Sequence, residues 1–482
     1  MSEVQIFSFL SMRTPHLAAL CEIAIDEARK GEKVRFFYCD KQIKKVGVMD
    51  CGIWGSCCFC LARAKKMQKI LSKESVEFSE FKIEEEISPK IEIPPEVFAS
   101  EQNFQSYIIE GFDVGSAVAS TSMNHKRETK FFSAFKREDL EMYLKRSVHL
   151  YRQLLKHFQR NRPNKVIIFN ARLSPDRAVY RATESLGIPV EVVEVAGTLN
   201  KYIRLINERP HDFYDWSKEI EELWSAASSL DLDQKTAVGS KWFEDSRYKP
   251  QRPFLRISGR MKKGKLPKNL DLNKKIISIF ASSDDERLAS GAKAPKSMFE
   301  TQIEGIRTLV KHFEDRKDIQ LVLRIHPNLS NLRNSQMHEL LCVSAQNLVV
   351  VKPEARVDSY ELLARSNIAV SFWSTIGIEA TYWGCPSIAL AANRSNDLNV
   401  VYTPKEFSEF CRMIDSDLPP KPKIQAVKFG YWKAMKGIPY KYYDRGKGYP
   451  WSGRFLGKST QPCLLSQFRW RVGLHFRIEE KR

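Results

Sequence analysis

The sequence predicts an α/β protein with two lobes, each built on an open parallel β-sheet. In both halves of the chain, short apolar runs that suit buried strands alternate with longer amphipathic segments that suit helices. The length of 482 residues favours two or three domains over one. Together these observations indicate two Rossmann-like domains that follow one another along the chain.

A change of composition marks the expected boundary between the lobes. Residues 251–272 hold many Lys and Arg among Pro and Gly, with almost no acidic residues. This composition is typical of a solvated linker, and a nucleic-acid signal is the weaker alternative. We therefore expect a first domain over residues 1–250, the basic linker over 251–272 and a second domain over 273–415. A C-terminal helix and a tail rich in aromatic and basic residues follow over 416–482.

The net charge narrows the classes of partner. The chain carries 77 Lys and Arg against 58 Asp and Glu, a formal net charge of +19. This excess fits nucleic acid, a phosphorylated substrate or an acidic membrane surface, and charge alone does not choose among them. The N-terminus has no basic region before its apolar run, and no apolar stretch approaches the ~20 residues that cross a bilayer. We therefore expect a cytoplasmic protein.

Ten cysteines are present, and we expect them to be thiols rather than disulfides in a cytoplasmic chain. Cys51, Cys57, Cys58 and Cys60 form a cluster in a segment that we expect to be a loop, with Cys39 upstream. Zinc is the alternative, but the spacing matches no standard ligand set and no histidine lies nearby. The sequence therefore predicts no metal site and no cofactor, and the role of the cluster stays open.

The first domain opens with a strand, a helix and a strand over residues 4–10, 15–30 and 33–39. His16 falls where the helix begins, at the carboxyl end of the first strand. Open α/β sheets bind their ligands at that edge, so His16 is a candidate functional residue. The alternative is a solvated histidine at a helix start.

Two later strands of this domain, over 165–170 and 189–195, also end in polar side chains. Asn170 and Arg172 lie at the end of the first strand, and Glu194 lies near the end of the second. Because the carboxyl ends of parallel strands meet at one rim, we expect these side chains to converge. Glu194 is a candidate acid or base, and a structural ion pair with Arg172 is the alternative.

The second domain begins with a strand over 276–281, followed by the hydroxyl pair Ser282 and Ser283. Hydroxyls on a turn after a strand can donate hydrogen bonds to a phosphate. The acidic residues that follow would repel a phosphate unless they point away from it.

A further strand over 320–325 ends in Arg324, His326 and Pro327. Histidine can donate a hydrogen bond to phosphate whether it is neutral or charged. Pro327 fixes the turn that directs the ring outward. A His-Pro pair alone has little specificity, so its position at a strand end carries the prediction.

The stretch from 366 to 390 reads as strand, turn, helix and strand. Ser374 and Thr375 stand where the helix should begin, which suits an N-cap and an anion site at the positive end of the helix dipole. Gly377 permits close approach of a ligand or of neighbouring backbone, and Glu379 can accept from a sugar hydroxyl. An ordinary capped helix between two strands is the alternative.

Residues 374–386 follow the pattern Ser-Thr-x-Gly-x-Glu-Ala, three residues, Gly-x-Pro. This pattern resembles the donor-site segment of GT-B glycosyltransferases, especially the bacterial capsule polysaccharide biosynthesis family that includes the Kdo transferases. The order of a His-Pro pair and then a Ser-Thr pair is similar to that of GT-B enzymes that use CMP-sugars. The resemblance covers most of the chain loosely and the second domain best.

The resemblance implies a GT-B fold, in which two Rossmann-like domains face a central cleft and a C-terminal segment returns to the first domain. It implies that His16 or Glu194 acts as the catalytic base and that Asn170 and Arg172 bind the acceptor. It also implies that hydroxyls and an imidazole hold the nucleotide phosphate while a glutamate holds the ribose. The predicted donor-binding residues are Ser282, Ser283, Arg324, His326, Pro327, Ser374, Thr375, Gly377 and Glu379.

We therefore expect a metal-independent glycosyltransferase that moves a sugar from a nucleotide-activated donor, with a CMP-sugar favoured, to a surface polysaccharide or lipid-linked acceptor. One alternative is a polyol-phosphate transferase that uses a CDP-polyol. Another is a non-catalytic protein that binds nucleic acid or membrane on the same fold. The donor sugar, the acceptor, the anomeric outcome and the oligomeric state stay open.

The expected partners are a nucleotide-activated sugar and a glycan or glycolipid acceptor, with no specific nucleic acid. The tail from Asp444 interleaves aromatic and basic residues, which suits an anionic inner-membrane surface, where each basic residue can contribute ~1 kcal/mol. Surface packing is the alternative. We expect a cytoplasmic protein that lies peripherally on the inner membrane. The aromatic residues of the tail are Trp451, Phe455, Phe468, Trp470 and Phe476.

Overall fold

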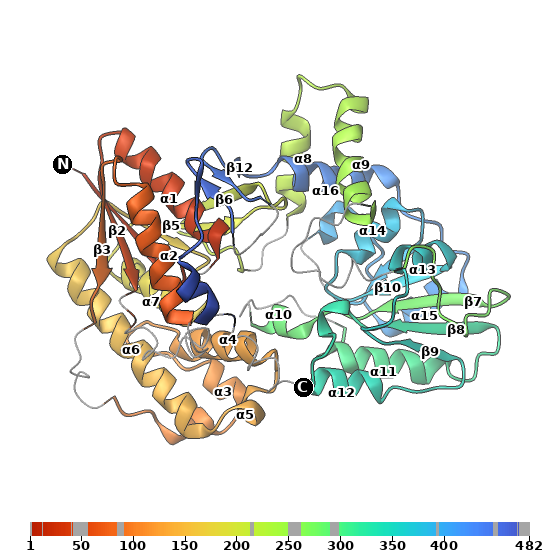
Figure 1. The fold of residues 1–482 in the computed structure, drawn as a ribbon. Helices are drawn as coiled ribbons and strands as arrows, with labels where there is room; N and C mark the ends of the chain where they lie inside the picture. Colours follow the sequence, from red (N-terminus) through yellow and green to blue (C-terminus); the bar gives the residue numbers. More distant parts are fainter. Residues whose placement is uncertain are drawn as a thin grey trace. The chain divides into compact units, whose positions relative to one another are not determined.

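The chain folds into two compact units, each a layered α/β structure (Figure 1). Unit 1 comprises Met1–Asp212, Leu288–Gly291 and Gly437–Arg482, and unit 2 comprises Phe213–Arg287 and Ala292–Lys436. The computed structural model describes residues 2–11, 13–39, 41, 56–83, 91–212, 216–248, 262–289, 298–391, 395–446, 452–469 and 471.

Unit 1 is built on a seven-stranded sheet in the order β12-β6-β5-β4-β1-β2-β3. β1 to β5 run parallel, and β6 and β12 add antiparallel strands at one edge. The chain proceeds from β1 to β2 and β3 on one side and then to β4 on the other, so the strand order reverses between β1 and β4. The strands are β1 (Glu3–Ser8), β2 (Lys33–Cys39), β3 (Val76–Phe81), β4 (Lys165–Phe169), β5 (Val190–Val195), β6 (Lys201–Ile206) and β12 (Ile438–Pro439).

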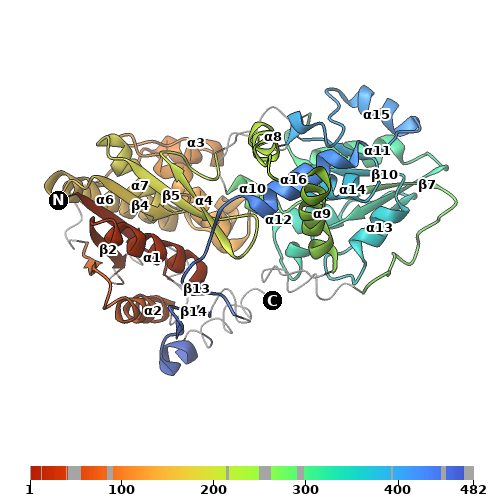
Figure 2. The ribbon, with the colours of Figure 1, turned by 90° about the horizontal axis from the view of Figure 1, so that it is seen from above.

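Helices cover both faces of this sheet (Figure 2). Alternate side chains of a strand point to opposite faces. Phe7 and Ile168 accordingly join the core under α4, α6 and α7, whereas Ile6 and Ile167 join the core under α1 and α2. The helical elements of unit 1 are α1 (Thr14–Arg29), α2 (Ser56–Ile70), η3 (Pro95–Phe98), α3 (Glu101–Gln105), α4 (Val114–Lys126), α5 (Phe131–Ala134), α6 (Arg137–Arg160) and α7 (Ser174–Ser185).

Part of the clustered cysteine segment is helical, so the expected loop over 51–60 is wrong for the residues that α2 includes. Phe59 and Cys60 are buried, and the Arg63 guanidinium lies 4.5 Å from the centroid of the Phe59 ring. Burial of these side chains against unit 1 favours the helix over a loop. Cys51 lies outside the described residues.

Unit 2 is built on a five-stranded parallel sheet in the order β11-β10-β7-β8-β9. The chain runs from β7 outward to β8 and β9 and then returns to β10 on the other side of β7. The strand order therefore reverses between β7 and β10. The strands are β7 (Lys275–Phe280), β8 (Ile319–Arg324), β9 (Leu348–Val351), β10 (Ile368–Ser371) and β11 (Ser387–Ala389).

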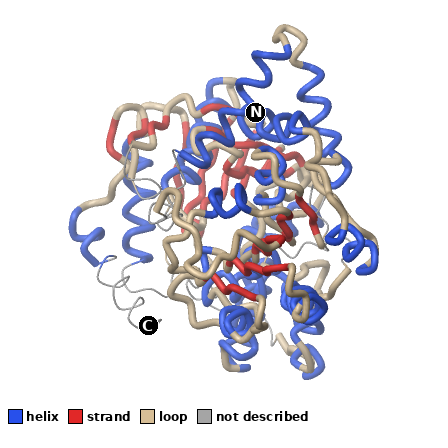
Figure 3. The backbone as a smooth tube through the Cα atoms, turned by 90° about the vertical axis from the view of Figure 1, so that its right-hand side faces the viewer, coloured by secondary structure: helices blue, strands red, loops and turns tan. Residues whose placement is uncertain are grey.

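Helices flank this sheet as well (Figure 3). Ile277 and Ile279 pack in the core under α11, α12 and α15, whereas Ile276 and Phe280 face α13 and α14. The helical elements are α10 (Asp284–Leu288), α11 (Gln302–Phe313), η5 (Pro327–Leu329), α12 (Ser335–Leu341), α13 (Ser359–Arg365), α14 (Ile376–Tyr382), η6 (Asn396–Leu398) and α15 (Phe407–Asp415).

Three further helices, α8 (Ser217–Ala226), α9 (Leu232–Tyr248) and α16 (Lys423–Met435), pack together in unit 2. The first domain was expected to extend to residue 250, whereas α8 and α9 belong to unit 2. The reason is that α9 buries Trp242 and Phe243 against side chains of α14 and α16. The basic linker was expected over 251–272, and residues 249–261 lie outside the described residues.

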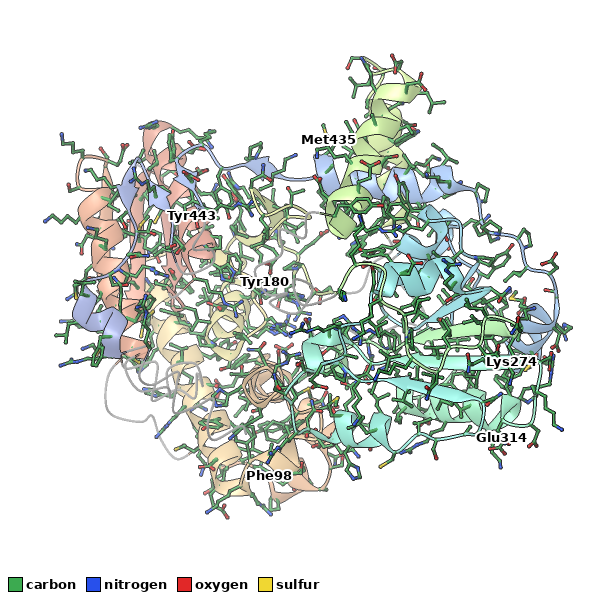
Figure 4. All side chains as sticks on the ribbon, turned by 45° about the vertical axis from the view of Figure 1, so that its right-hand side comes forward. Phe98, Tyr180, Lys274, Glu314, Met435 and Tyr443 are labelled. Atoms are coloured by element: carbon green, nitrogen blue, oxygen red, sulfur yellow. The ribbon has the colours of Figure 1, made fainter. Side chains whose placement is uncertain are left out.

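The C-terminal segment returns to unit 1, as the fold class predicts. Glu22 of α1 is buried, and its carboxylate accepts hydrogen bonds from the backbone N–H groups of Lys441 (3.0 Å), Tyr442 (2.7 Å) and Tyr443 (3.0 Å). Tyr443 is labelled in Figure 4. Burial raises the pKa of Glu22, although the three N–H donors oppose that shift. One carboxylate therefore fastens the returning backbone to α1.

The tail continues into a small antiparallel sheet of β13 (Tyr443–Asp444), β14 (Arg454–Phe455) and β15 (Lys458–Ser459). Phe455 is fully buried there, whereas Phe468 is exposed. The tail residues Trp451, Trp470 and Phe476 lie outside the described residues.

The crossing of α9 and α16 yields a stability prediction. A Cβ added at Gly430 would lie 2.3 Å from the Gly239 carbonyl oxygen, which is backbone and cannot move aside as a side chain can. We expect Gly430→Ala to lower the free energy of unfolding by roughly 1–3 kcal/mol, the usual cost of overpacking. Ala237→Ser, at an exposed position of α9, should stay within about 0.5 kcal/mol of the parent. Urea unfolding measures both, and equal midpoints for Gly430→Ala and the parent would contradict the packing described.

Candidate functional site

Polar residues of unit 2 meet at one edge of its sheet. β10, β7 and β8 are parallel neighbours in that order, so their carboxyl ends lie side by side. Ser374 and Thr375 follow β10, Ser282 and Ser283 follow β7, and His326 follows β8. The strand order reverses between β7 and β10, and ligands of open α/β sheets bind outside the carboxyl ends at such a reversal. The structure thus brings these predicted donor residues to one rim.

Two buried glutamines hold the turn after β7. Gln302 accepts a hydrogen bond from the backbone N–H of Ser282 (2.6 Å) and donates to its carbonyl oxygen (3.2 Å). Gln336 accepts from the N–H of Asp284 (3.1 Å) and donates to the same Ser282 carbonyl (2.8 Å). The Ser282 hydroxyl is buried and has no hydrogen-bond partner among the described residues. A fixed turn therefore carries a hydroxyl that could donate to a ligand.

Arg287 belongs to the same corner, and sequence reasoning missed it. Its guanidinium lies 4.0 Å from the centroid of the Trp373 ring, and Trp373 directly precedes Ser374. Burial raises the pKa of nearby Asp284 to about 6, although Arg287 opposes that shift. A cation close behind the serine pair in the sequence SSDDER was the available signal.

Glu379 of α14 is held by two hydroxyl groups. Thr375 Oγ1 donates to Oε1 of Glu379 (3.0 Å), and the phenol of Tyr360 donates to Oε2 (2.6 Å). Ser374 Oγ accepts from the N–H of Ile376 (3.3 Å), as a residue at a helix start should. Thr375 makes no side-chain cap, since its hydroxyl bonds to Glu379 instead. Tyr360 was not among the predicted residues, yet it orients Glu379, the residue that was predicted to bind the ribose.

Gly377 lets α14 lie close against the sheet. A Cβ at this position would lie 2.7 Å from Ser371 Oγ and 3.1 Å from Ser387 Oγ. These serines belong to β10 and β11, so the close approach is to neighbouring strands. Glycine at this position therefore sets how near Glu379 stands to the strand ends.

His326 and Arg324 have different surroundings, although Arg324 ends β8 and His326 follows two residues later. The Nδ1 atom of His326 accepts from the N–H of Asn328 (3.1 Å) where Pro327 begins η5, so the neutral ring carries its proton on Nε2 and can donate from there. Arg324 is buried and donates to the Lys352 carbonyl oxygen (2.8 Å). Burial lowers the pKa of Arg324 to about 10, and Arg324 holds the loop that follows β9.

Predicted residues also meet at the rim of unit 1, where the strand order reverses. The His16 ring stacks on Phe169 at the end of β4, with 3.9 Å between ring centroids. The Asn170 amide donates to the carboxylate of Glu194, near the end of β5. Burial and the charge of Arg13 lower the pKa of His16 to about 3, although Glu194 opposes the shift. His16 is therefore neutral at physiological pH.

His211 joins this group, and sequence reasoning missed it. Its Nε2 lies 2.8 Å from Asn170 Nδ2 and 3.6 Å from Glu194 Oε2. Burial favours the neutral form of Glu194, but the hydrogen bond and charge of His211, together with His16 and the backbone N–H of Val195, outweigh that effect and lower the pKa of Glu194. Asn170 and Ala171 have left-handed backbone angles, with φ of 67° and 55°. Such angles are strained in residues other than glycine and tend to occur at functional sites.

Arg172 lies near this group but has a different partner. Its guanidinium donates to Asn124 Oδ1 on α4 (3.1 Å). The contacts of Glu194 are with Asn170, His211 and the backbone N–H of Val195 (2.8 Å). The carboxylate that was weighed as an ion-pair partner of Arg172 is thus engaged by a histidine and an amide.

A buried carboxyl group lies in the first turn of α7, close to this rim in the sequence. Asp176 is 5% exposed, and burial raises the pKa of Asp176 to about 8. The helix start is fixed by the N–H of Ser174, which donates to Thr121 Oγ1 on α4 (3.0 Å). At neutral pH, Asp176 is therefore mostly protonated in the folded protein.

Neither a metal centre nor a membrane span is found in the part of the chain that the structure describes. No three His, Cys, Asp or Glu side chains there gather in a way that could hold a metal ion. No described helix combines the length and the apolar character that a membrane crossing requires.

The arrangement of elements defines the fold class. Each unit has an open α/β sheet with a reversal of strand order and helices on both faces, and the C-terminal segment passes from α16 of unit 2 back to unit 1. The chain has the GT-B fold that the sequence predicted.

The sequence matches no protein-family model and no curated protein. Solved structures do resemble it. One is the KpsC β-Kdo 2,7-transferase of Thermosulfurimonas dismutans, with 14% identity, a TM-score of 0.34 and coverage of 68% of this chain and 89% of that chain. Another is the UDP-GlcNAc 2-epimerase of Neisseria meningitidis bound to UDP-GlcNAc, with 12% identity, a TM-score of 0.30 and coverage of 92% and 96%.

Asp176 makes stability depend on pH. Its ordinary pKa is 3.8 and its folded pKa about 8, so between these values the unfolded chain has lost a proton that the folded chain keeps, and stability falls as pH rises. We expect Asp176→Asn to gain stability relative to the parent as pH rises from 5 to 8, by about 1 kcal/mol or more. Urea unfolding of both proteins at both pH values measures this. A difference in unfolding free energy between variant and parent that does not change with pH would show that Asp176 is ionised in the folded state.

Proposed function

We propose that the chain is a glycosyltransferase that takes a sugar from a nucleotide-activated donor, with a CMP-sugar favoured. The observation that carries this proposal is the meeting of polar corners after β10, β7 and β8 at the strand reversal of unit 2. Such an edge suits a nucleotide, because ligands of open α/β sheets bind where the strand order reverses and the residues after these strands can donate hydrogen bonds to a phosphate. The proposed acceptor is a surface polysaccharide or its lipid-linked precursor.

In the proposed donor site, different residues bind the phosphate and the ribose. His326 donates from Nε2 to the phosphate, and Ser282 donates through its buried hydroxyl. Arg287 brings the positive charge that stabilises the departing nucleotide, a role that a divalent cation fills in other folds. Glu379, held by Tyr360 and Thr375, keeps lone pairs for the ribose hydroxyls. The proposed donor site therefore needs no metal ion.

The proposed acceptor site is the rim of unit 1. His16 and Glu194 are the predicted candidates for handling the acceptor proton, and Asn170 lies between Glu194 and His211. Arg172 extends the polar surface toward α4. A strained backbone at Asn170 supports a functional role for this rim.

We also propose that the protein works in the cytoplasm, against the anionic inner membrane. Leu464, Leu465 and Phe468 are 81%, 60% and 63% exposed, and the exposed Arg469 and Arg471 follow them. Apolar side chains beside cations are typical of segments that lie on anionic lipid. This surface would bring the enzyme to a lipid-linked acceptor.

A panel of ligands tests the nucleotide class. We expect CMP to raise the melting temperature, with about 2.7 kcal/mol of stabilisation at 100 times its Kd, and cytidine to do so far less because it lacks the phosphate. Stabilisation by CDP-polyols in preference to CMP-sugars would favour the polyol-phosphate alternative. Stabilisation by RNA with no effect of any mononucleotide would overturn the transferase proposal.

Single substitutions test the roles of the donor residues. We expect Arg287→Gln to weaken CMP binding by roughly 10- to 100-fold and to leave cytidine binding unchanged, since a charged hydrogen bond to phosphate is lost. His326→Ala should behave similarly, whereas Glu379→Ala should weaken both ligands because both carry the ribose. Arg307→Gln, which removes an exposed charge on α11, is the matched control. Isothermal titration calorimetry measures each Kd. Parental affinity in all three site variants would contradict the proposed donor site.

A further inference from the structure

Five side chains of unit 2 gather where α9 ends, and only Tyr360 among them has a part in the proposed donor site. The guanidinium carbon of Arg247 lies 4.6 Å from the centroid of the Trp383 ring, 5.3 Å from that of Tyr248 and 5.6 Å from that of Tyr360. Lys263 Nζ lies 5.6 Å from the centroid of the Tyr248 ring. Trp383 packs edge-on against both tyrosine rings, with 6.2 Å between centroids in each pair. We call these five residues the cation–aromatic platform.

The Arg247 side chain is held by aromatic rings alone. Within the described residues, its guanidinium makes no hydrogen bond and no ion pair. A guanidinium carries five N–H donors in a planar fork that matches a carboxylate or a phosphate. The Arg247 side chain is partly buried, and Tyr248 beside it is 53% exposed. The platform therefore presents a positioned cation with unused donors next to an accessible aromatic ring.

Hydrogen bonds fix the turn that carries Lys263. Asp358 Oδ2 accepts from the backbone N–H of Gly264 (3.0 Å), and the N–H of Asp358 donates to the Lys265 carbonyl oxygen (2.8 Å). The same carboxylate caps α13 by accepting from the N–H of Tyr360 (3.0 Å). Because one residue holds both the turn and the helix, Lys263 and Tyr360 keep fixed positions relative to each other.

The surface around the platform is basic. Lys262, Lys265 and Arg356 are exposed, and the N–H of Lys262 donates to the Arg356 carbonyl oxygen (3.0 Å). In the part of the chain that the structure describes, none of these three side chains forms an ion pair, and neither does Lys263 or Arg247. A group of uncompensated cations attracts a polyanion, and added salt weakens that attraction.

The exposed side chains distinguish between classes of polyanion. Single-stranded nucleic acid stacks its bases on successive aromatic rings, whereas Tyr248 is the one exposed ring of the platform. A segment that lies on anionic lipid carries apolar side chains beside its cations, whereas the exposed neighbours of Tyr248 in the turn are lysines. An acidic glycan needs one ring for the C–H face of a sugar and cations for its carboxylates. The platform fits the acidic glycan best.

We propose that the platform binds an acidic polysaccharide, with Tyr248 against a sugar ring and with Arg247 and Lys263 on carboxylate groups of the chain. This inference rests on the proposed function and adds the chemical class of its glycan. Tyr360 contacts Arg247 and also donates to Glu379 (2.6 Å), so the bound chain lies beside the proposed donor site of the same unit.

Binding of oligogalacturonate, a glycan with a carboxylate on every sugar, tests the platform. At low salt we expect the full-length protein to bind this glycan, and Arg247→Gln to weaken binding by roughly 10-fold or more, because a charged hydrogen bond is lost. Lys263→Gln, on an exposed turn, should weaken it too. Tyr248→Ala should weaken binding and Tyr248→Phe should preserve it, since the ring and not the hydroxyl contacts the sugar. Fluorescence anisotropy of labelled oligogalacturonate measures each Kd.

Arg307→Gln is the matched control, because it removes the same charge from an exposed position on α11 that has no aromatic neighbour in the platform. Parental affinity in Arg247→Gln and Lys263→Gln, or an equal loss in Arg307→Gln, would overturn the inference. Tighter binding of single-stranded RNA of equal charge would assign the surface to nucleic acid, and binding of anionic vesicles without oligogalacturonate would assign it to lipid; either result excludes the glycan.

CMP binding by the same variants separates this inference from the proposed function. Loss of CMP affinity in Arg247→Gln would place the platform within the donor site and overturn the separate glycan site. Failure of the parent protein to bind CMP would overturn the proposed function, whereas CMP binding without any binding of oligogalacturonate would overturn the glycan site alone.

Discussion

Parallel strands deliver their carboxyl ends to a single edge of a sheet, and both units depend on this constraint. Where the strand order reverses, the loops after two neighbouring strands diverge and leave room for a ligand. In unit 2 the reversal separates β7 from β10, and in unit 1 it separates β1 from β4. Ser282 and Ser374 flank the first reversal, and His16 and Asn170 flank the second. Chemistry-bearing side chains thus gather at both places where the topology permits a site.

Buried polar networks keep these edges rigid. Gln302 and Gln336 together satisfy the backbone of the turn after β7, and Tyr360 with Thr375 satisfies the carboxylate of Glu379. A buried polar group that loses its partner costs about 1–3 kcal/mol, so each of these groups has one preferred orientation. The hydroxyl of Ser282 is buried among these networks, and it has no hydrogen-bond partner in the described region. Gln302 and Gln336 thus build the turn, whereas the Ser282 hydroxyl could bind a ligand.

The fold class and most rim residues could be predicted because they depend on local pattern: a strand ends, and a polar residue follows. His211 could not, since β6 is antiparallel and ends at the opposite edge, and only the returning segment brings the ring to Glu194. Tyr360 reaches Glu379 from a different helix. Arg287 closely follows the serine pair in the sequence, but only the fold places its guanidinium against Trp373. The boundary of the first domain was misplaced for a related reason, because the partners of α9 lie far away in the sequence. Contacts between residues that are far apart in the sequence leave no periodic pattern in that sequence.

The pairing of β12 with β6 bears on how the protein is made. β6 would otherwise present a row of unpaired backbone groups, and such edges recruit other chains. Ile438 and Pro439 pair with Tyr202 and Lys201 at one end of this strand, and they leave the ribosome only after all of unit 2 has been synthesised. During translation this end of β6 therefore stays unpaired until the C-terminal segment that Glu22 binds has been synthesised. Nascent chains that stall before this point would be the ones most exposed to self-association.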